Sequence, residues 1–211
     1  ILDYFSRSNV SSFIFDMIYS ENSLYGKSDD ERFSESSRKF GKAIQTVFYD
    51  ENNDLSQKVY PIPLLKNSCA SLGSVQSLLD KDGVARRARL FSSSKEKEAS
   101  LSIAALLLEK NNFDLNKIPL AKDGGMYIRF QNDLTRYAPY NAAQILKSEY
   151  LLRNLSTDEV INQEDFIEPE NFDNMHIFFG LLAPGLYDIC STPVSSAYPG
   201  VGVHISQLDT I

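Results

Sequence analysis

The sequence lacks the long apolar segments that membrane-spanning helices require. No apolar run among its 211 residues approaches the roughly 20 residues needed to cross a bilayer, and the longest, Ile103–Leu108, is far shorter. The chain begins at Ile1 without a signal-peptide pattern. We therefore expect a processed chain or a part of a longer protein, and a soluble segment says nothing against a membrane-bound parent.

The sequence also has little clustered positive charge. Its 21 Lys and Arg are outnumbered by 28 Asp and Glu, which gives a formal net charge of −7. Proteins that bind nucleic acids usually carry a basic patch that neutralises phosphates. The nearest candidate, Arg86-Arg87-x-Arg89, is short and runs into Leu90-Phe91. We expect no nucleic-acid partner.

Motifs for nucleophilic catalysis and for nucleotide binding are missing. There is no G-x-S-x-G nucleophile elbow and no G-x-G-x-x-G or P-loop pattern. Gly180-x-x-x-x-Gly185 is followed by Leu-Tyr where a P-loop needs Lys and Ser or Thr. We assign no catalytic residue, and an α/β hydrolase-like enzyme remains an alternative that lacks its nucleophile motif.

Metal ligands are scarce. Zinc takes three or four ligands, commonly with a closely spaced pair, whereas His176 and His204 are the only histidines. Asp80-x-Asp82-Gly83 resembles the start of a calcium loop, but Val84 follows it and the closing Glu is absent, so we expect a tight turn. We predict no metal site and no cofactor.

Cys69 and Cys190 are the only cysteines. Two cysteines can be small buried apolar residues, or they can form a disulfide if the compartment is oxidising and their Cα atoms are close. The residues alone leave both alternatives open.

What is present is the composition and patterning of a globular α/β domain. The apolar share of 43% can offset the entropy of ordering the chain. Phe13–Tyr19 and Ala43–Tyr49 are continuous apolar runs, which favour strands buried on both faces. Between them, Asp29 or Asp30 can cap a helix that ends at Gly41. These segments predict a βαβ unit.

The later segments extend this pattern. We predict an α/β fold with a mainly parallel, mixed central sheet, helices on both faces, and antiparallel strands in the middle of the chain, in one domain over 1–211. The further elements are expected as helices over Ile1–Arg7, Lys66–Leu72, Glu96–Lys110 and Val203–Ile211, short helices capped by Asn141 and by the Ser156/Glu159 pair, turns at Asp80–Gly83 and Asp123–Gly125, strands over Val84–Phe91, Met126–Phe130 and His176–Gly180, and a loop over Ala183–Gly202.

Four polar residues are the candidates for a ligand site. Asp16 lies inside an apolar strand, where a carboxylate needs hydrogen-bond partners or a place at the strand's carboxyl end. Asp188, Thr192 and His204 lie on or beside the loop after the last strand, and Pro193 and Pro199-Gly200 stiffen that loop. We hypothesise that the four side chains converge at the carboxyl edge of the sheet, where open α/β sheets bind ligands. A purely structural corner is the alternative.

Several segments in a fixed order are similar to one family. An apolar strand runs into Asp-x-x-Tyr-Ser-Glu, an acidic helix start follows, and later come an Asp-x-Asp-Gly-Val-x-Arg-Arg segment and a closing series of Gly and Pro motifs that ends in a histidine. The matching segments are Phe15–Glu21, Asp29–Phe33, Leu72-Gly73, Asp80–Arg87, Tyr137–Ala143, Ile177–Gly180, Ala183–Asp188, Thr192–Val194, Pro199–Val201 and His204.

By these motifs the chain resembles the type-two CHASE domain, the extracytoplasmic module of bacterial adenylate cyclases, histidine kinases, diguanylate cyclases and some serine/threonine kinases. The resemblance implies a non-enzymatic sensor on the periplasmic or extracellular face of the cell membrane. It implies an unknown small extracellular ligand, membrane helices outside this chain, and a homodimer. The residues of its structural motifs are Asp80, Asp82, Gly83, Arg86, Pro193, Pro199 and Gly200.

The sequence departs from the family pattern in places. The first strand and the start of the first helix are missing, Leu155–Asn174 is long, Gly202 stands where an acidic residue is common, and Ile205 replaces a small residue. A periplasmic location would allow a Cys69–Cys190 bridge to form, but two unpaired cysteines stay the preferred interpretation. A ligand-free dimerisation or assembly module with the same fold is the main alternative function.

Overall fold

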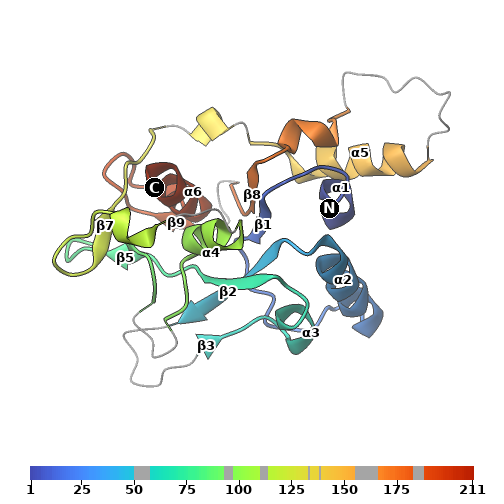
Figure 1. The fold of residues 1–211 in the computed structure, drawn as a ribbon, viewed down its shortest axis with the longest axis horizontal. Coiled ribbons are helices and arrows are strands. Elements are labelled where there is room, and N and C mark those ends of the chain that lie inside the picture. The colour runs from blue at the N-terminus through green and yellow to red at the C-terminus, as the bar shows by residue number, and fades with distance from the viewer. Residues whose placement is uncertain are drawn as a thin grey trace.

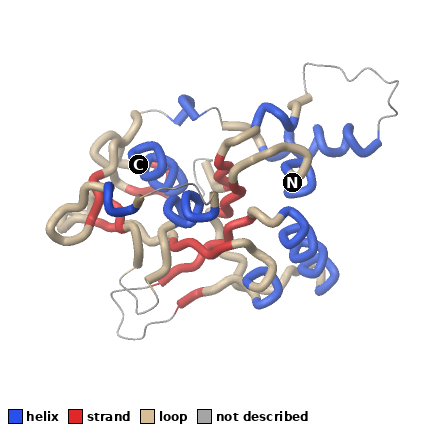
Figure 2. The backbone as a smooth tube through the Cα atoms, in the orientation of Figure 1, coloured by secondary structure: helices blue, strands red, loops and turns tan. Residues whose placement is uncertain are grey.

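The computed structural model describes residues 1–49, 58–92, 97–109, 114–132, 134–137, 139–154, 166–182 and 188–211. These residues form an α/β fold, with a mixed and mostly parallel sheet, helices around it, and small antiparallel sheets beside it (Figures 1 and 2). This confirms the predicted fold class. No helix among these residues has both the length and the apolar content of a membrane span.

The central sheet is built around strand β1 (Ser12–Phe15). Strands β2 (Ala43–Tyr49) and β8 (His176–Phe179) flank β1, and β4 (Ser71–Ser74) lies outside β2; all three run parallel to their neighbours. The short β3 (Lys58–Val59) pairs antiparallel with the end of β2. The order of the parallel strands is therefore β4-β2-β1-β8.

The connections between these strands set the position of a topological switch point. The chain passes from β1 through helix α2 (Lys27–Phe40) to β2, and then through α3 (Pro63–Lys66) to β4. Strand β8 instead lies on the other side of β1. The strand order therefore reverses between β1 and β8, and open α/β sheets bind ligands outside the carboxyl ends of strands at such a point.

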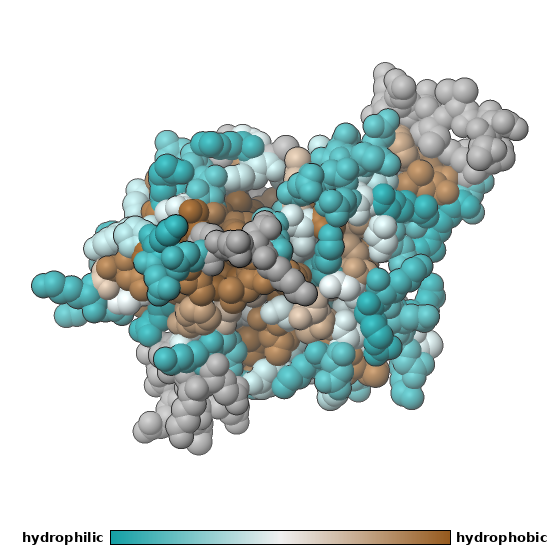
Figure 3. Space-filling view, viewed as in Figure 1, coloured by the Kyte–Doolittle hydropathy of each residue, from teal (hydrophilic) through white to brown (hydrophobic). Residues whose placement is uncertain are grey.

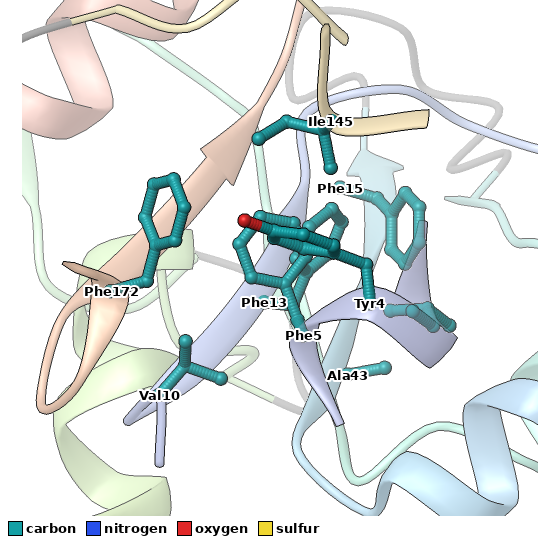
Figure 4. Packing of buried hydrophobic residues seen from close by; sticks show 9 residues of the cluster. Tyr4, Phe5, Val10, Phe13, Phe15, Ala43, Ile145 and Phe172 are labelled. Carbon is teal, nitrogen blue, oxygen red and sulfur yellow. The ribbon is translucent and has the colours of Figure 1, made fainter. Parts of the chain in front are cut away.

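One face of the sheet is covered by an aromatic cluster. Phe13 and Phe15 point to this face and pack with Phe5 of helix α1 (Leu2–Phe5) and with Phe172 of the short helix η3 (Pro169–Phe172) (Figure 4). Helix α5 (Ala142–Asn154) adds Ile145 to the cluster. Contacts between aromatic rings stabilise a core beyond the burial of their area.

The other face packs on α4 (Leu101–Leu108) and α6 (Gly200–Thr210). Ile14 alternates with Phe13 and Phe15 along β1, and both Ile14 and Ile44 pack against Leu101 of α4. All four residues of β1 are buried, as expected for a parallel strand covered by helices on both sides.

A three-stranded antiparallel sheet stands beside the central one. It contains β5 (Leu78–Leu79), β6 (Ala85–Arg89) and β7 (Gly125–Tyr127). The predicted Asp80–Gly83 turn connects β5 to β6, and the predicted Asp123–Gly125 turn leads into β7. Gly83 has φ +78° and Gly124 has φ +80°, values that favour glycine. A two-stranded pair, β9 (Ile189–Cys190) with β10 (Tyr198–Pro199), precedes α6. The short helices η1 and η2 span Leu115–Lys117 and Leu134–Tyr137.

The Asp80-x-Asp82 motif is an ion-pair site for arginine. Arg86 contacts Asp80 at 2.9 Å and Asp82 at 2.8 Å, and Arg87 pairs with Asp80 and with Asp123. These guanidinium groups hold the pKa values of Asp80 and Asp82 below their usual range, that of Asp82 at about 2. The carboxylates that suggested calcium therefore fasten the turn to β6.

The structure corrects the prediction of a helix over Lys66–Leu72. Helix α3 ends at Lys66, and Ser71–Ser74 is strand β4 of the central sheet. A Cβ added to Gly73 would lie 2.9 Å from the Cα of Leu101, so β4 can lie under α4 only with glycine at this position. Its polar, small-residue sequence carries no apolar pattern that would have predicted a buried strand.

Other predicted elements keep their type but change their bounds. The helix predicted over Glu96–Lys110 begins at Leu101, because the Ser100 hydroxyl caps it by accepting from the N–H of Ile103. The final helix begins at Gly200, inside the predicted loop. Asn141 caps α5 as predicted, by accepting from the N–H of Ala143 at 2.8 Å. The predicted Ser156/Glu159 capping box lies outside the described residues.

Both cysteines are free thiols. Cys69 follows α3 and Cys190 ends β9, and both are partly buried. Burial raises the pKa of each thiol, which keeps both protonated and unreactive at neutral pH. The structure therefore agrees with the interpretation of two unpaired cysteines and not with the alternative of a Cys69–Cys190 bridge.

Candidate functional site at the strand switch point

The carboxyl ends of β1 and β8 meet at the switch point. Asp16 directly follows β1 and Gly180 directly follows β8. The backbone N–H of Asp16 donates to the carbonyl of Phe179 at 2.8 Å, so the two strand ends stay paired up to this edge. The side chain of Asp16 leaves the sheet on the face covered by α6, because it alternates with Phe15.

The first turn of α6 presses directly on these strand ends. A Cβ added to Gly180 would lie 2.9 Å from the Cβ of Val201 and 3.2 Å from the Cβ of Asp16. No side chain fits there unless a neighbour moves. Asp188 is held against the start of the same helix, since its carbonyl accepts from the N–H of Gly200 at 3.0 Å. Its carboxylate occupies the space that a side chain at position 200 would fill.

His204 of α6 completes this group. Its Nε2 lies 3.7 Å from Oδ1 of Asp16, and the two side chains are only 7% and 5% exposed. The distance exceeds that of a hydrogen bond, so the two groups lie side by side without a direct bond. The backbone carbonyl of His204 accepts from the Ser102 hydroxyl of α4 at 2.7 Å, which fixes the helix at this position.

Burial controls the charges of the group. Burial, and to a lesser extent the nearby Asp188 carboxylate, raises the pKa of Asp16 to about 8. Burial lowers the pKa of His204 to about 4 and raises the pKa of Asp188. Desolvation thus outweighs the attraction that would favour an ion pair. At neutral pH Asp16 carries a proton and His204 is neutral.

Three of the four predicted site residues come together here, and the hydroxyl of the fourth, Thr192, is bonded to another residue. The Thr192 hydroxyl accepts from the N–H of Ser195 at 3.2 Å and donates to its carbonyl at 3.1 Å. Within the described residues no hydrogen bond or ion pair joins Thr192 to Asp16, Asp188 or His204. Thr192 therefore closes its own turn around Pro193. A ligand-binding role for any of the four stays a prediction.

A second polar group at the opposite edge was not predicted. His176 Nδ1 lies 2.8 Å from the Ser12 hydroxyl and its Nε2 lies 3.3 Å from Glu109 Oε1. The order Ser-His-Glu resembles a hydrolase triad, but Ser12 is wholly buried in β1 and cannot meet a substrate. The group joins α4 to the starts of β1 and β8. Pairing of Ser12 with His176 depends on the strand register, which the sequence does not display.

The switch-point group contains three titratable side chains, those of Asp16, Asp188 and His204. Within the described part of the chain, no three His, Cys, Asp or Glu side chains lie close enough to hold a metal ion. Asp16 and His204 face each other across a buried contact, and Asp188 stands at the exposed rim. Such an arrangement can bind and release protons and can respond to a shift of α6.

Open α/β sheets bind their ligands at such a switch point, and the polar residues of this sheet gather there. The CHASE2 domain family model matches residues 1–211, the whole chain. The chain belongs to the CHASE2 family, a family of extracytoplasmic sensory domains. This confirms the resemblance found in the sequence. No curated protein and no solved structure matches the chain.

Proposed function

We propose that this domain senses a small extracytoplasmic ligand for a bacterial transmembrane receptor and passes the signal to a cytoplasmic cyclase or kinase domain. One observation carries the proposal: the buried contact of Asp16 with His204, which joins the end of β1 to α6 at the switch point. Asp188 adds a carboxylate at the start of the same helix. A ligand that moves these strand ends would move α6.

The mechanism is a population shift between two packings of α6 on the sheet. A ligand shifts such an equilibrium only by the difference in its affinity for the two states. A buried contact between two uncharged groups costs little to separate, whereas a buried ion pair broken by loss of one partner is strongly destabilising. The neutral Asp16–His204 contact suits a helix that must change position.

A homodimer next to the membrane belongs to the same proposal. Apolar side chains are exposed on the face that carries α4, where Leu107 is 47% exposed (Figure 3). Leu181 and Leu182, just after β8, are also exposed. These residues favour burial against another surface. They also support the alternative that the domain only assembles the receptor and binds no small ligand.

A thermal-shift screen against metabolites, ions and pH tests the sensory proposal. A ligand present at a hundred times its Kd stabilises by about 2.7 kcal/mol, which corresponds to roughly 5 to 10 °C for a domain of this size. We expect Asp16→Asn and His204→Gln to reduce the shift and Glu35→Gln, an exposed substitution on α2, to leave it unchanged. A flat screen with a concentration-dependent dimer would favour assembly instead.

A further inference from the structure

An open cavity of about 760 Å³ lies beside the loop that follows β1 at the carboxyl end of the strand. Ser20, Glu21 and Asn22 form one wall. Tyr60–Pro63 and the residues Lys66 and Asn67, at the end of α3, form the other. The N–H of Ile62 donates to the carbonyl of Tyr19 at 2.8 Å, which holds the two walls together. The volume lies within the range of small-molecule sites.

The polar side chains of this cavity are not used by the fold. Within the described residues, the side chains of Ser20, Glu21, Asn22 and Asn67 make no hydrogen bond or ion pair. The Lys66 ammonium lies 3.7 Å from the centre of the Tyr60 ring and forms no ion pair with a described residue. These five residues are exposed, so water satisfies their polar groups until a ligand displaces it. The cavity therefore offers hydroxyl, amide, carboxylate and ammonium groups to a ligand.

The two charges of the cavity define the class of ligand. Glu21 is negative and Lys66 is positive, and no ion pair joins them although both line the same cavity. An anion would pair with Lys66 and meet repulsion from Glu21, and a cation would meet the reverse. A molecule with both charges can pair with each residue. Electrostatic complementarity of this kind selects partners.

We propose that this cavity binds a small zwitterion of the amino-acid type, with its ammonium group toward Glu21 and its carboxylate toward Lys66. Asn22, Asn67 and Ser20 supply hydrogen bonds, and Pro61, Ile62 and Tyr60 supply apolar contacts to its side chain. The inference rests on the proposed sensory function and names the ligand class.

The cavity is connected to the switch point by the chain itself. Asp16 opens the loop that leads to Ser20, Glu21 and Asn22. A ligand that orders this loop would act on the strand end that contacts His204. Ligand class and relay can therefore be tested separately, since the first concerns Glu21 and Lys66 and the second concerns Asp16 and His204.

Isothermal titration of the domain with each of the twenty natural L-amino acids tests the ligand class. The tightest binder is then compared with its N-acetyl form, which lacks the ammonium, and its amide, which lacks the carboxylate. We expect each blocked form, and each of Glu21→Gln and Lys66→Gln, to weaken binding about tenfold or more, as loss of a charged hydrogen bond does. Lys27→Gln and Glu31→Gln, which remove an exposed ion pair of α2, should have no effect.

Three results would overturn the inference. They are no binding of any amino acid at millimolar concentration, binding unaffected by both cavity variants, and full binding of one blocked form, which would show a singly charged ligand. Hydrogen exchange of α6 separates this inference from the relay. If an amino acid binds but protects α6 equally in wild type and His204→Gln, the cavity stands and the relay through His204 fails. If only another metabolite stabilises the domain, the sensor stands and the zwitterion site fails.

Discussion

His204 Nε2 and Asp16 Oδ1 face each other at 3.7 Å in the interior, with both side chains more than nine-tenths buried. The carboxyl group belongs to the sheet and the imidazole to the helix that packs on the ends of β1 and β8. A carboxyl group beside an imidazole would ordinarily form an ion pair, but burial favours the uncharged form of each. The packing of α6 is therefore linked to pH.

The stability of the domain should fall as the pH rises from 6.5 to 8. The pKa of Asp16 is about 8 when folded and 3.8 ordinarily, so the folded state holds a proton that the unfolded chain loses. Its stabilising effect is complete below pH 3.8 and is lost as the pH rises through 8. His204, at about 4 against 6.5, has the opposite effect between those values. The two nearly cancel from pH 4 to 6.5.

Of these two groups only Asp16 contributes above pH 6.5, at about 1.4 kcal/mol per pH unit, or about 2 kcal/mol in all by pH 8. Urea unfolding of wild type and Asp16→Asn at pH 6, 7 and 8 measures this. Asparagine cannot ionise, so the variant should lose this pH dependence and exceed the wild type in stability at pH 8. Parallel pH curves for the two proteins would contradict the charge states assigned to the pair.

Gly180→Ala should displace α6. The added Cβ would lie 2.9 Å from Cβ and Cγ2 of Val201, and such overpacking costs about 1–3 kcal/mol. Denaturant unfolding gives the loss. Val201→Ala in the Gly180→Ala background should recover part of the lost stability, because it removes Cγ2 of Val201 and leaves only Cβ near the added group. Simple addition of the two single effects in the double variant would show that the helix does not press on the strand end.

Reducing agent should leave the melting temperature unchanged. Cys69 and Cys190 are both free thiols, so no covalent link can be lost. A native disulfide would contribute about 2–4 kcal/mol and its reduction would lower the melting temperature measurably. Intact mass after alkylation of the unfolded, unreduced protein should show two modified cysteines. A single species with neither modified would show that the bridge forms after all.

The sequence was most informative where apolar residues are continuous. The runs around Phe13 and Ala43 and the stop at Gly41 predicted β1, α2 and β2, because strands buried on both faces need apolar side chains throughout. Strand β4 was missed because its two buried residues are glycine and serine. Its position depends on the contact of Gly73 with Leu101, a relationship between distant residues that no local pattern carries.

The candidate site likewise contains residues that the sequence could predict and residues that it could not. Asp16, Asp188 and His204 could be predicted from a carboxylate in an apolar strand and from the rule for strand switch points. Thr192 was included by its position in the sequence, but its hydroxyl closes a turn with Ser195, a local bond that competes with any other role. The pairing of Ser12 with His176 required the strand register and could not be predicted.

Gln45→Met should stabilise the domain. Gln45 lies in the middle of β2 with no exposed surface, and neither its Nε2 nor its Oε1 has a hydrogen-bond partner among the described residues. An unsatisfied buried amide costs about 1–3 kcal/mol, and methionine has a similar shape without that cost. Urea unfolding should show a gain of about 1 kcal/mol or more.

Gln207→Met is the matched control for this prediction. Gln207 is also almost wholly buried, but its Nε2 donates to the carbonyl of Arg89 at 3.2 Å. The same substitution there removes a made hydrogen bond and should cost about 1 kcal/mol. Opposite signs at the two positions would show that pairing, and not burial of an amide as such, decides the free energy. If Gln45→Met destabilises as Gln207→Met does, the Gln45 amide has a partner in solution, and β2 binds a polar group at its centre.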